Sequence, residues 1–191
     1  VDRASAEALD ITSMDDLLRP EVRDTFDHDG DGLADLYGCD EGWGCHLVIE
    51  EHLEQLDWGS AVEQVVDDYD ALLTEAVVRI AQGQPTLFYT WTPNWTTGVL
   101  TPGEDVLWLE SPALPEQERS TSVEGLEGCA APDPCELGWV VNDIRAVANT
   151  EFLEANPPVR RLLEQITIPL EDIAAQNARM EAAEEYTDAD I

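Results

Sequence analysis

Four cysteines at two identical spacings constrain this chain more than any other feature. Cys39 and Cys45 form one C-x5-C pattern, and Cys129 and Cys135 form the other. Four cysteines allow three pairings, and Gly or Pro beside each pair lets the chain turn back, which favours the two local pairings. Each closed ring would add roughly 2–2.5 kcal/mol of stability. The alternative is a metal site, but C-x5-C is not a common zinc spacing. We therefore predict two disulfides in an exported protein.

Charge excludes several classes of partner. The 191 residues include 42 acidic and 9 basic side chains, every basic one an arginine, for a formal net charge of −33. Such a surface repels nucleic-acid phosphate and anionic lipid, so neither is an expected partner. Because 43% of the residues are hydrophobic, the chain has enough apolar material to fold despite its acidity.

The length suits one domain or two small lobes. The chain begins at Val1 without an apolar signal region, so we expect a processed or excised piece of a longer protein. It contains no run of 18 or more apolar residues that could span a membrane.

Apolar periodicity and turn residues predict alternating helices and short strands. Ser60-Ala-Val-Glu63 reads as a capping box that starts a helix, and Gly83 would end that helix in a left-handed conformation. Helices that alternate with strands indicate an α/β fold. The expected helices cover 45–56, 60–80, 150–166 with an interruption at Pro157-Pro158, and 170–185; the expected strands cover 86–91 and 106–109; a long loop covers 111–136.

The first candidate site is the loop Cys39-Asp-Glu-Gly-Trp-Gly-Cys45. A disulfide ring with glycines around Trp43 is a stiff loop that presents one aromatic side chain. Glycines let successive N–H groups converge, and the loop leads into a helix start, so the amides could bind a carboxylate. The alternative is a structural turn with a packed tryptophan.

The second candidate is Tyr89-Thr-Trp-Thr-Pro-Asn-Trp95, at the end of an expected strand. Ligands of α/β proteins bind at such strand ends, although core packing would also explain the tryptophans. Six Trp against three Phe favours a ligand, since Trp has the strongest face for a cation. Trp faces with converging amides would suit a small zwitterion that carries a methylated ammonium and a carboxylate.

The third candidate is the acidic stretch Asp27-His-Asp-Gly-Asp-Gly-Leu-Ala-Asp35. Carboxylates at relative positions 1, 3, 5 and 9 with Gly at 6 resemble the first part of an EF-hand loop. Gly38 occupies position 12, where the bidentate glutamate would stand. A turn rich in Asp and Gly without metal is the alternative. The calcium ligands would be Asp27, Asp29, Asp31 and Asp35.

Enzyme signatures are missing from the sequence. The histidines are His28, His46 and His52, and none belongs to an H-E-x-x-H motif. Neither a G-x-S-x-G motif nor a P-loop is present. No covalent chemistry, and no cofactor other than a calcium ion, is therefore expected.

Several long motifs carry a family resemblance. Phe26 to Cys45, Gly83-Gln-Pro-Thr-Leu-Phe-Tyr-Thr-Trp-Thr-Pro-Asn-Trp95, Leu100 to Leu109 and Ile173-Ala-Ala-Gln-Asn-Ala-Arg-Met180 resemble, in this order, the ProX-type glycine betaine/proline betaine-binding proteins of ABC importers. The similarity covers about residues 10 to 190.

The resemblance implies a lobe of a bilobal, type II periplasmic-binding-protein fold. Trp43 and Trp91 match two members of the family's Trp box around the quaternary ammonium group, and the amides of Gly44 and Cys45 match its carboxylate contacts. The part of the family's first lobe that supplies a third Trp and a His has no counterpart here. Residues 1–143 would form the second, ligand-binding lobe, and 144–191 a return crossover with helices that pack on the first lobe.

The implied function is extracytoplasmic solute binding. The ligand would be glycine betaine, proline betaine or a choline-like molecule, and the partner a membrane permease. The protein would be periplasmic or anchored to the outer face of the cell membrane. The alternative function is that of a secreted acidic calcium-binding module with no transport role.

Overall fold

A three-stranded parallel sheet forms the centre of the computed structural model, which describes residues 1–114, 122–140 and 144–181. The strands are β1 (Ala34–Tyr37), β2 (Val62–Val65) and β3 (Leu87–Phe88), in the order β2-β1-β3. Every residue of the central strand β1 is buried, as expected for a parallel strand that is covered on both faces. The predicted α/β fold class is confirmed.

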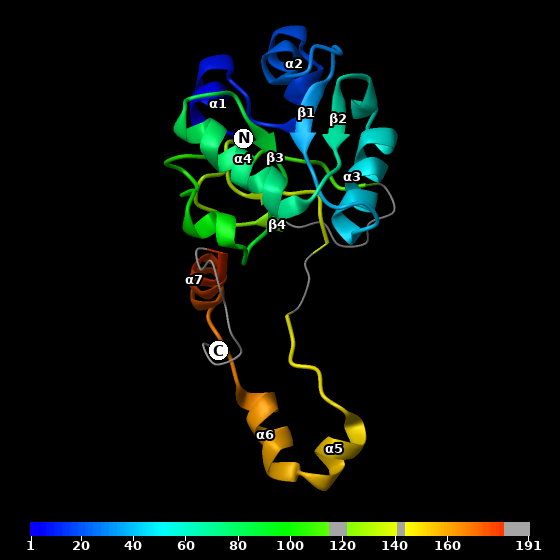
Figure 1. Cartoon of the computed structure of the whole chain (residues 1–191), viewed down its shortest axis with the longest axis vertical. Helices are drawn as coiled ribbons and strands as arrows, with labels where there is room; N and C mark the ends of the chain where they lie inside the picture. Colours follow the sequence, from blue (N-terminus) through cyan, green and yellow to red (C-terminus); the bar gives the residue numbers. More distant parts are fainter. Residues whose placement is uncertain (115–121, 141–143, 182–191) are drawn as a thin grey trace.

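Two helices cover opposite faces of this sheet. The helix α3 (Gly44–Gln55) packs with Leu36 of β1, and α4 (Tyr69–Ala81) packs with the next residue, Tyr37, in a separate core cluster. Successive side chains of a strand point to opposite faces, so the two clusters lie on the two sides of β1. The crossovers β1–α3–β2 and β2–α4–β3 make each strand end at the same edge (Figure 1).

Short elements surround the sheet. A small antiparallel pair, β4 (Ser122–Val123) and β5 (Cys135–Glu136), includes Cys135, and the Cys129–Cys135 disulfide beside it confirms the second predicted ring. The remaining elements of the globular part are α1 (Arg3–Leu9), the 3-10 helix η1 (Met14–Leu18), α2 (Pro20–Phe26) and the 3-10 helices η2 (Trp58–Ser60) and η3 (Trp95–Gly98).

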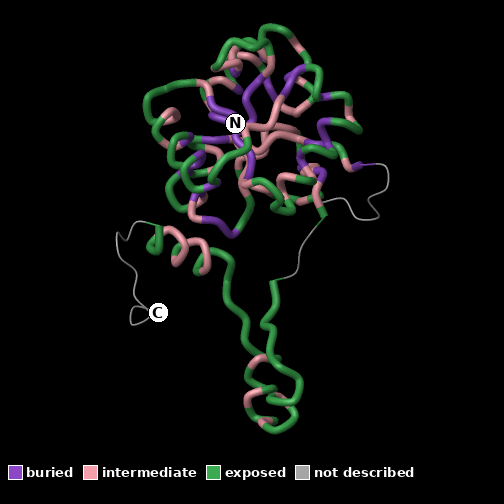
Figure 2. Tube along the Cα trace, turned by 45° about the vertical axis from the view of Figure 1, so that its right-hand side comes forward, coloured by how far each residue is buried: buried purple, intermediate pink, exposed green. Residues whose placement is uncertain are grey.

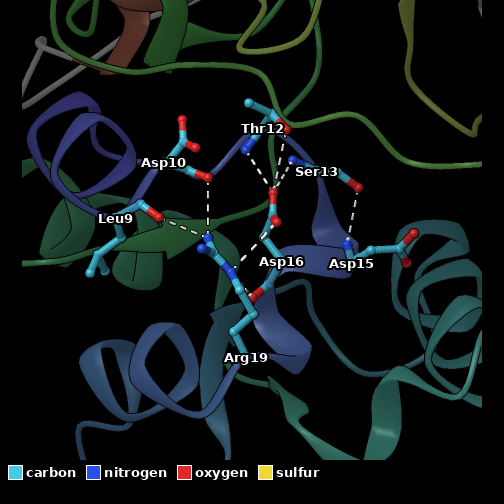
Figure 3. A network of polar contacts seen from close by, with 7 residues as sticks. All are labelled: Leu9, Asp10, Thr12, Ser13, Asp15, Asp16 and Arg19. Atoms are coloured by element: carbon cyan, nitrogen blue, oxygen red, sulfur yellow. Dashed lines mark hydrogen bonds and ion pairs between the residues drawn. The ribbon is translucent and has the colours of Figure 1, made fainter.

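A polar network fixes the turn between α1 and η1 (Figure 3). The Asp16 carboxylate accepts hydrogen bonds from the backbone N–H of Thr12 at 2.8 Å and of Ser13 at 3.0 Å. The Ser13 hydroxyl accepts one from the Asp15 N–H, which completes the cap of η1. The Arg19 guanidinium donates hydrogen bonds to the carbonyl oxygens of Leu9 and Asp10, so side chains satisfy the backbone groups of this turn.

An arm extends from the globular part. It contains α5 (Thr150–Ala155) and α6 (Pro157–Gln165), after which the chain returns to α7 (Leu170–Glu181) (Figure 1). Figure 2 shows that most of the arm is exposed. α7 packs against η3, where a Cβ on Gly98 would lie 2.9 Å from Cβ of Ala178. The absence of a side chain at Gly98 therefore permits this close approach.

The predicted helix over 60–80 is wrong at its start. Residues 62–65 form β2, and the helix begins at Tyr69, where the Asp68 side chain accepts a hydrogen bond from the N–H of Ala71. The valines of β2 fit a helical period and a buried strand equally well, and pairing with β1 decides between them. The predicted left-handed Gly83 is confirmed, with φ of 69°.

The other expected elements differ mainly in extent. The helices predicted over 45–56 and 150–166 are present, the second as α5 and α6, whereas the strand over 86–91 shortens to β3. The strand over 106–109 is wrong, since Val106 and Trp108 form only isolated bridges. The predicted loop over 111–136 includes both β4 and β5 in its described part. Residues 182–185 of the last predicted helix, and the predicted domain boundary at 143, lie outside the described residues.

None of the helices in the described ranges combines the length and the apolar character needed to cross a membrane.

Candidate ligand-binding site

The loop that follows β1 presents Trp43 to solvent. A disulfide joins Cys39 to Cys45 with their Cα atoms 6.2 Å apart, which confirms the first predicted ring. Gly42 adopts a φ of 83°, a conformation that other residues rarely adopt. Cys39 is fully buried, whereas the Trp43 side chain is 46% exposed. The ring is thus anchored in the core at one end and displays an aromatic face at its tip.

The helix α3 starts directly behind this tryptophan. Trp43 is the N-cap residue and makes no side-chain cap hydrogen bond. Gly44 and Cys45 occupy the first turn, where the N–H groups have no partner within the helix. These amides carry the positive end of the helix dipole, which favours a bound anionic group. The arrangement can therefore receive a carboxylate beside an aromatic face.

Trp91 lies at the same edge of the sheet. It follows β3, the parallel neighbour of β1, so both tryptophans come after the carboxyl ends of adjacent strands. Its side chain is 37% exposed. Crevices outside the carboxyl ends of parallel strands are the usual ligand sites of open α/β sheets. The topology therefore brings together two candidates that are 48 positions apart in sequence.

Tyr69, which lies inside the helix that the sequence predicted over 60–80, joins the two tryptophans. The Tyr69 ring lies 5.9 Å from the Trp43 ring and 5.0 Å from the Trp91 ring, measured between centroids, with interplanar angles near 30° in both pairs. Burial raises the pKa of Tyr69 above its ordinary value. The local signal for its place at the helix start is Asp68 directly before it, a residue type that commonly caps helices.

Two further aromatic residues lie near the site in different roles. Trp139 packs between Tyr89 at 4.7 Å and His52 at 5.7 Å, again between ring centroids. The Trp95 indole donates a hydrogen bond to the Asp70 carboxylate at 3.1 Å. Tyr89 in turn lies 5.9 Å from Trp91, so the exposed site continues into a packed aromatic core.

The acidic candidate is assembled at the opposite edge of the sheet, around the amino ends of β1 and β2. Asp27, Asp29 and Asp35 bring carboxylate oxygens within 4.8 Å of one another. A second group combines Asp29 and Asp31 with Glu63, a residue absent from the predicted ligand set. Glu63 joins because it pairs with Asp35 across the parallel strands β1 and β2.

Backbone N–H groups already occupy several of these oxygens. Asp27 accepts hydrogen bonds from Gly30 at 2.7 Å and from Gly32 at 2.9 Å, and Asp35 accepts one from His28 at 2.6 Å. Such bonds stabilise a turn rich in Asp and Gly without an ion. Burial, followed by the neighbouring carboxylates, raises the pKa of Glu63, as expected where negative charges converge. Carboxylate oxygens are suitable ligands for a hard cation such as Ca²⁺. The backbone hydrogen bonds alone, however, are enough to explain the conformation of this turn.

Comparison with known proteins identifies the family. Residues 1–190 match the family model OpuAC, described as the substrate binding domain of an ABC-type glycine betaine transport system. The chain belongs to the OpuAC family. The OpuAC family is a substrate-binding, non-catalytic family, in agreement with the lack of enzyme motifs in the sequence.

Three curated proteins are similar to this OpuAC chain. It is 39% identical over 96% of its length to the glycine betaine-binding periplasmic protein OusX of Dickeya dadantii. Glycine betaine/proline betaine-binding periplasmic proteins of Salmonella typhimurium and Escherichia coli are 36% and 35% identical over 100% and 94% of the chain. The matches cover 54%, 56% and 53% of these proteins, so the chain spans about half the length of the curated relatives it matches.

Proposed function

We propose that this chain is the ligand-binding lobe of an extracytoplasmic solute-binding protein that serves an ABC importer. The ligand is glycine betaine or a related quaternary-ammonium osmoprotectant such as proline betaine. The proposal depends on one observation above all: two partly exposed tryptophans and a helix start lie together at the carboxyl edge of the sheet. The periplasmic relatives support an exported location, either in the periplasm or anchored to the outer face of the membrane.

Each part of a betaine has a matching group in this site. The methylated ammonium cannot donate a conventional hydrogen bond, so it is recognised by aromatic faces, here Trp43 and Trp91. The carboxylate would accept hydrogen bonds from the amides of Gly44 and Cys45 at the start of α3. Carboxylates elsewhere on this acidic chain are solvated and screened by salt, so they contribute attraction without specificity.

The arm suggests where a second lobe packs. Residues 144–169 contain three arginines and three glutamates, whose charges cancel in a chain of net charge −33. The described arm also exposes several large apolar side chains, and exposed apolar patches of this kind mark interaction surfaces. We propose that α5 and α6 pack on a first lobe, which the remaining half of the relatives' length would supply. The exposed apolar residues are Ile144, Val147, Phe152, Leu162, Ile166 and Ile168.

Closure of two lobes around the ligand would present the loaded protein to a membrane permease. In this arrangement residues 1–143 provide the Trp faces and the amides, and 144–191 provide the return crossover. A ligand held between lobes is removed from water, which strengthens both the aromatic and the amide contacts.

Isothermal titration calorimetry with glycine betaine tests the proposal. The titration is done on the chain itself and on a chimaera in which the Salmonella relative supplies the remaining residues. Glycine, which has no methyl groups, and tetramethylammonium, which has no carboxylate, serve as matched ligands. Glycine betaine should bind more tightly than either. Trp91→Ala should weaken binding by roughly 5- to 30-fold, as for a desolvated cation–π contact of about 1–2 kcal/mol.

A calcium titration on the same samples separates the alternative function. If Ca²⁺ binds, and glycine betaine binds to neither the chain nor the chimaera while the Salmonella relative itself binds it, the transport function is wrong. The calcium-module function then takes its place, and Asp27→Asn should abolish the calcium signal.

A further inference from the structure

We infer that Tyr69 is a positioning residue that fixes the Trp43 and Trp91 faces relative to each other. This inference rests on the proposed function, in which those faces bind the ligand cation. Tyr69 begins α4 and belongs to neither of the two loops that carry the tryptophans. Tyr69 contacts both of these loops, which follow different strands, and it links them to the buried core.

Tyr69 is bound to the Trp43 loop by its backbone and by its ring. Its N–H donates a 3.0 Å hydrogen bond to the carboxylate of Asp40, which lies within the Cys39–Cys45 ring. Its aromatic ring packs on Trp43 at an interplanar angle of 31°. The disulfide limits the conformations of the loop itself, and the two contacts with Tyr69 set how the loop sits on the sheet.

The hydroxyl end of the same side chain contacts the Trp91 loop. The Tyr69 hydroxyl lies 3.4 Å from the carbonyl oxygen of Tyr89 and 3.3 Å from Oγ1 of Thr90, and both can accept its hydrogen. These residues directly precede Trp91, whose ring packs on Tyr69 at 30°. The side chain thus holds the backbone before Trp91 and the Trp91 ring together.

Burial explains why Tyr69 can hold both tryptophan rings in place. Its side chain is 3% exposed, against 46% for Trp43 and 37% for Trp91. A buried side chain in a packed cluster has one well-defined position, whereas exposed aromatic rings can change rotamer. Tyr69 does not present its own face to solvent, so it acts on the ligand through the tryptophans. The angle and spacing of the two Trp faces then determine which ammonium groups fit between them.

Fluorine NMR of the chain labelled with 5-fluorotryptophan tests this inference without requiring a ligand. The chain contains six tryptophans, and Trp43→Phe and Trp91→Phe assign the two relevant signals. Tyr69→Leu removes the ring and the hydroxyl, and Tyr69→Phe removes only the hydroxyl. Leu73→Ala is the control for lost stability, because Leu73 is fully buried in the same helix and cluster. Tyr37→Phe is the control for a lost buried hydroxyl, since Tyr37 donates to Glu75 instead.

Tyr69→Leu should shift the signals of both Trp43 and Trp91, whereas Tyr69→Phe should restore the Trp43 signal and leave the Trp91 signal shifted. The two controls should leave both signals in place. Glycine betaine affinity should fall by about two- to tenfold in Tyr69→Leu, the effect of losing a tilted aromatic pair, and recover only in part in Tyr69→Phe, which keeps the ring but lacks the hydroxyl. The inference is overturned if Tyr69→Leu moves only one signal or neither, or if Leu73→Ala moves both equally. A wild-type protein and chimaera that ignore betaine would overturn the proposed function instead, while the NMR result still decides the role of Tyr69.

Discussion

Removal of the Cys39–Cys45 disulfide gives the sharpest test of how this fold is stabilised. The two disulfides have the same sequence separation of 6, so the chain-entropy estimate assigns each the same contribution of about 2.3 kcal/mol. In each pair one cysteine is fully buried, Cys39 in the first and Cys135 in the second. The double variants Cys39→Ala/Cys45→Ala and Cys129→Ala/Cys135→Ala should therefore lose similar free energies of unfolding.

Equilibrium unfolding in urea at constant salt measures both losses. Urea is preferable to guanidinium chloride, because a salt denaturant would also screen the acidic surface. The midpoint should fall with little change in the slope, since the folded state keeps its core. A loss below about 1 kcal/mol for either pair, or a difference above about 1 kcal/mol between them, would refute the view that closure of the unfolded chain dominates.

Three other perturbations test separate parts of the structure. Asp16→Ala leaves two backbone N–H groups without their acceptor and should lower the free energy of unfolding by about 2 kcal/mol, whereas the exposed Asp24→Ala should stay within about 0.5 kcal/mol; equal losses in urea would contradict the network's role. Burial raises the pKa of Tyr89 to about 12, so the unfolded chain loses this proton first and stability should fall as pH rises from about 10 to about 12; Tyr89→Phe should lessen that fall, and an unchanged slope would count against it. With a net charge of −33, the melting temperature should rise from low to molar sodium chloride, and a flat response would show that repulsion among the carboxylates is unimportant.

Local features were the ones that the sequence could predict. The start of α3 lies within one residue of its expected position. Its signals, a Gly-rich ring followed by apolar residues at helical spacing, lie within a few residues of that start. The same holds for the local disulfides and for the interruption at Pro157, which begins α6. Each of these depends on neighbours in the chain rather than on tertiary pairing.

Features that depend on strand pairing were missed. The spacing of the valines over 62–65 fits a helix, but these residues form a strand because they pair with β1, 28 residues earlier in the chain. That pairing also brought Glu63 to the acidic cluster. At the candidate site, the sequence predicted Trp91 after a strand and Trp43 in a disulfide ring before a helix, but it did not predict β1, the strand that precedes this ring. The position of Tyr69 between them was not predicted, because it requires knowing that β1 and β3 are neighbours.

The arm leaves the globular part and comes back to it, and this double connection restricts how anything seated on α5 and α6 can move (Figure 1). On the return side the restraint is firm, because α7 packs against η3 at Gly98, a few residues beyond Trp91. In the two-lobed protein proposed above, the return segment would act as a hinge whose fixed end, α7 on η3, lies a few residues beyond Trp91.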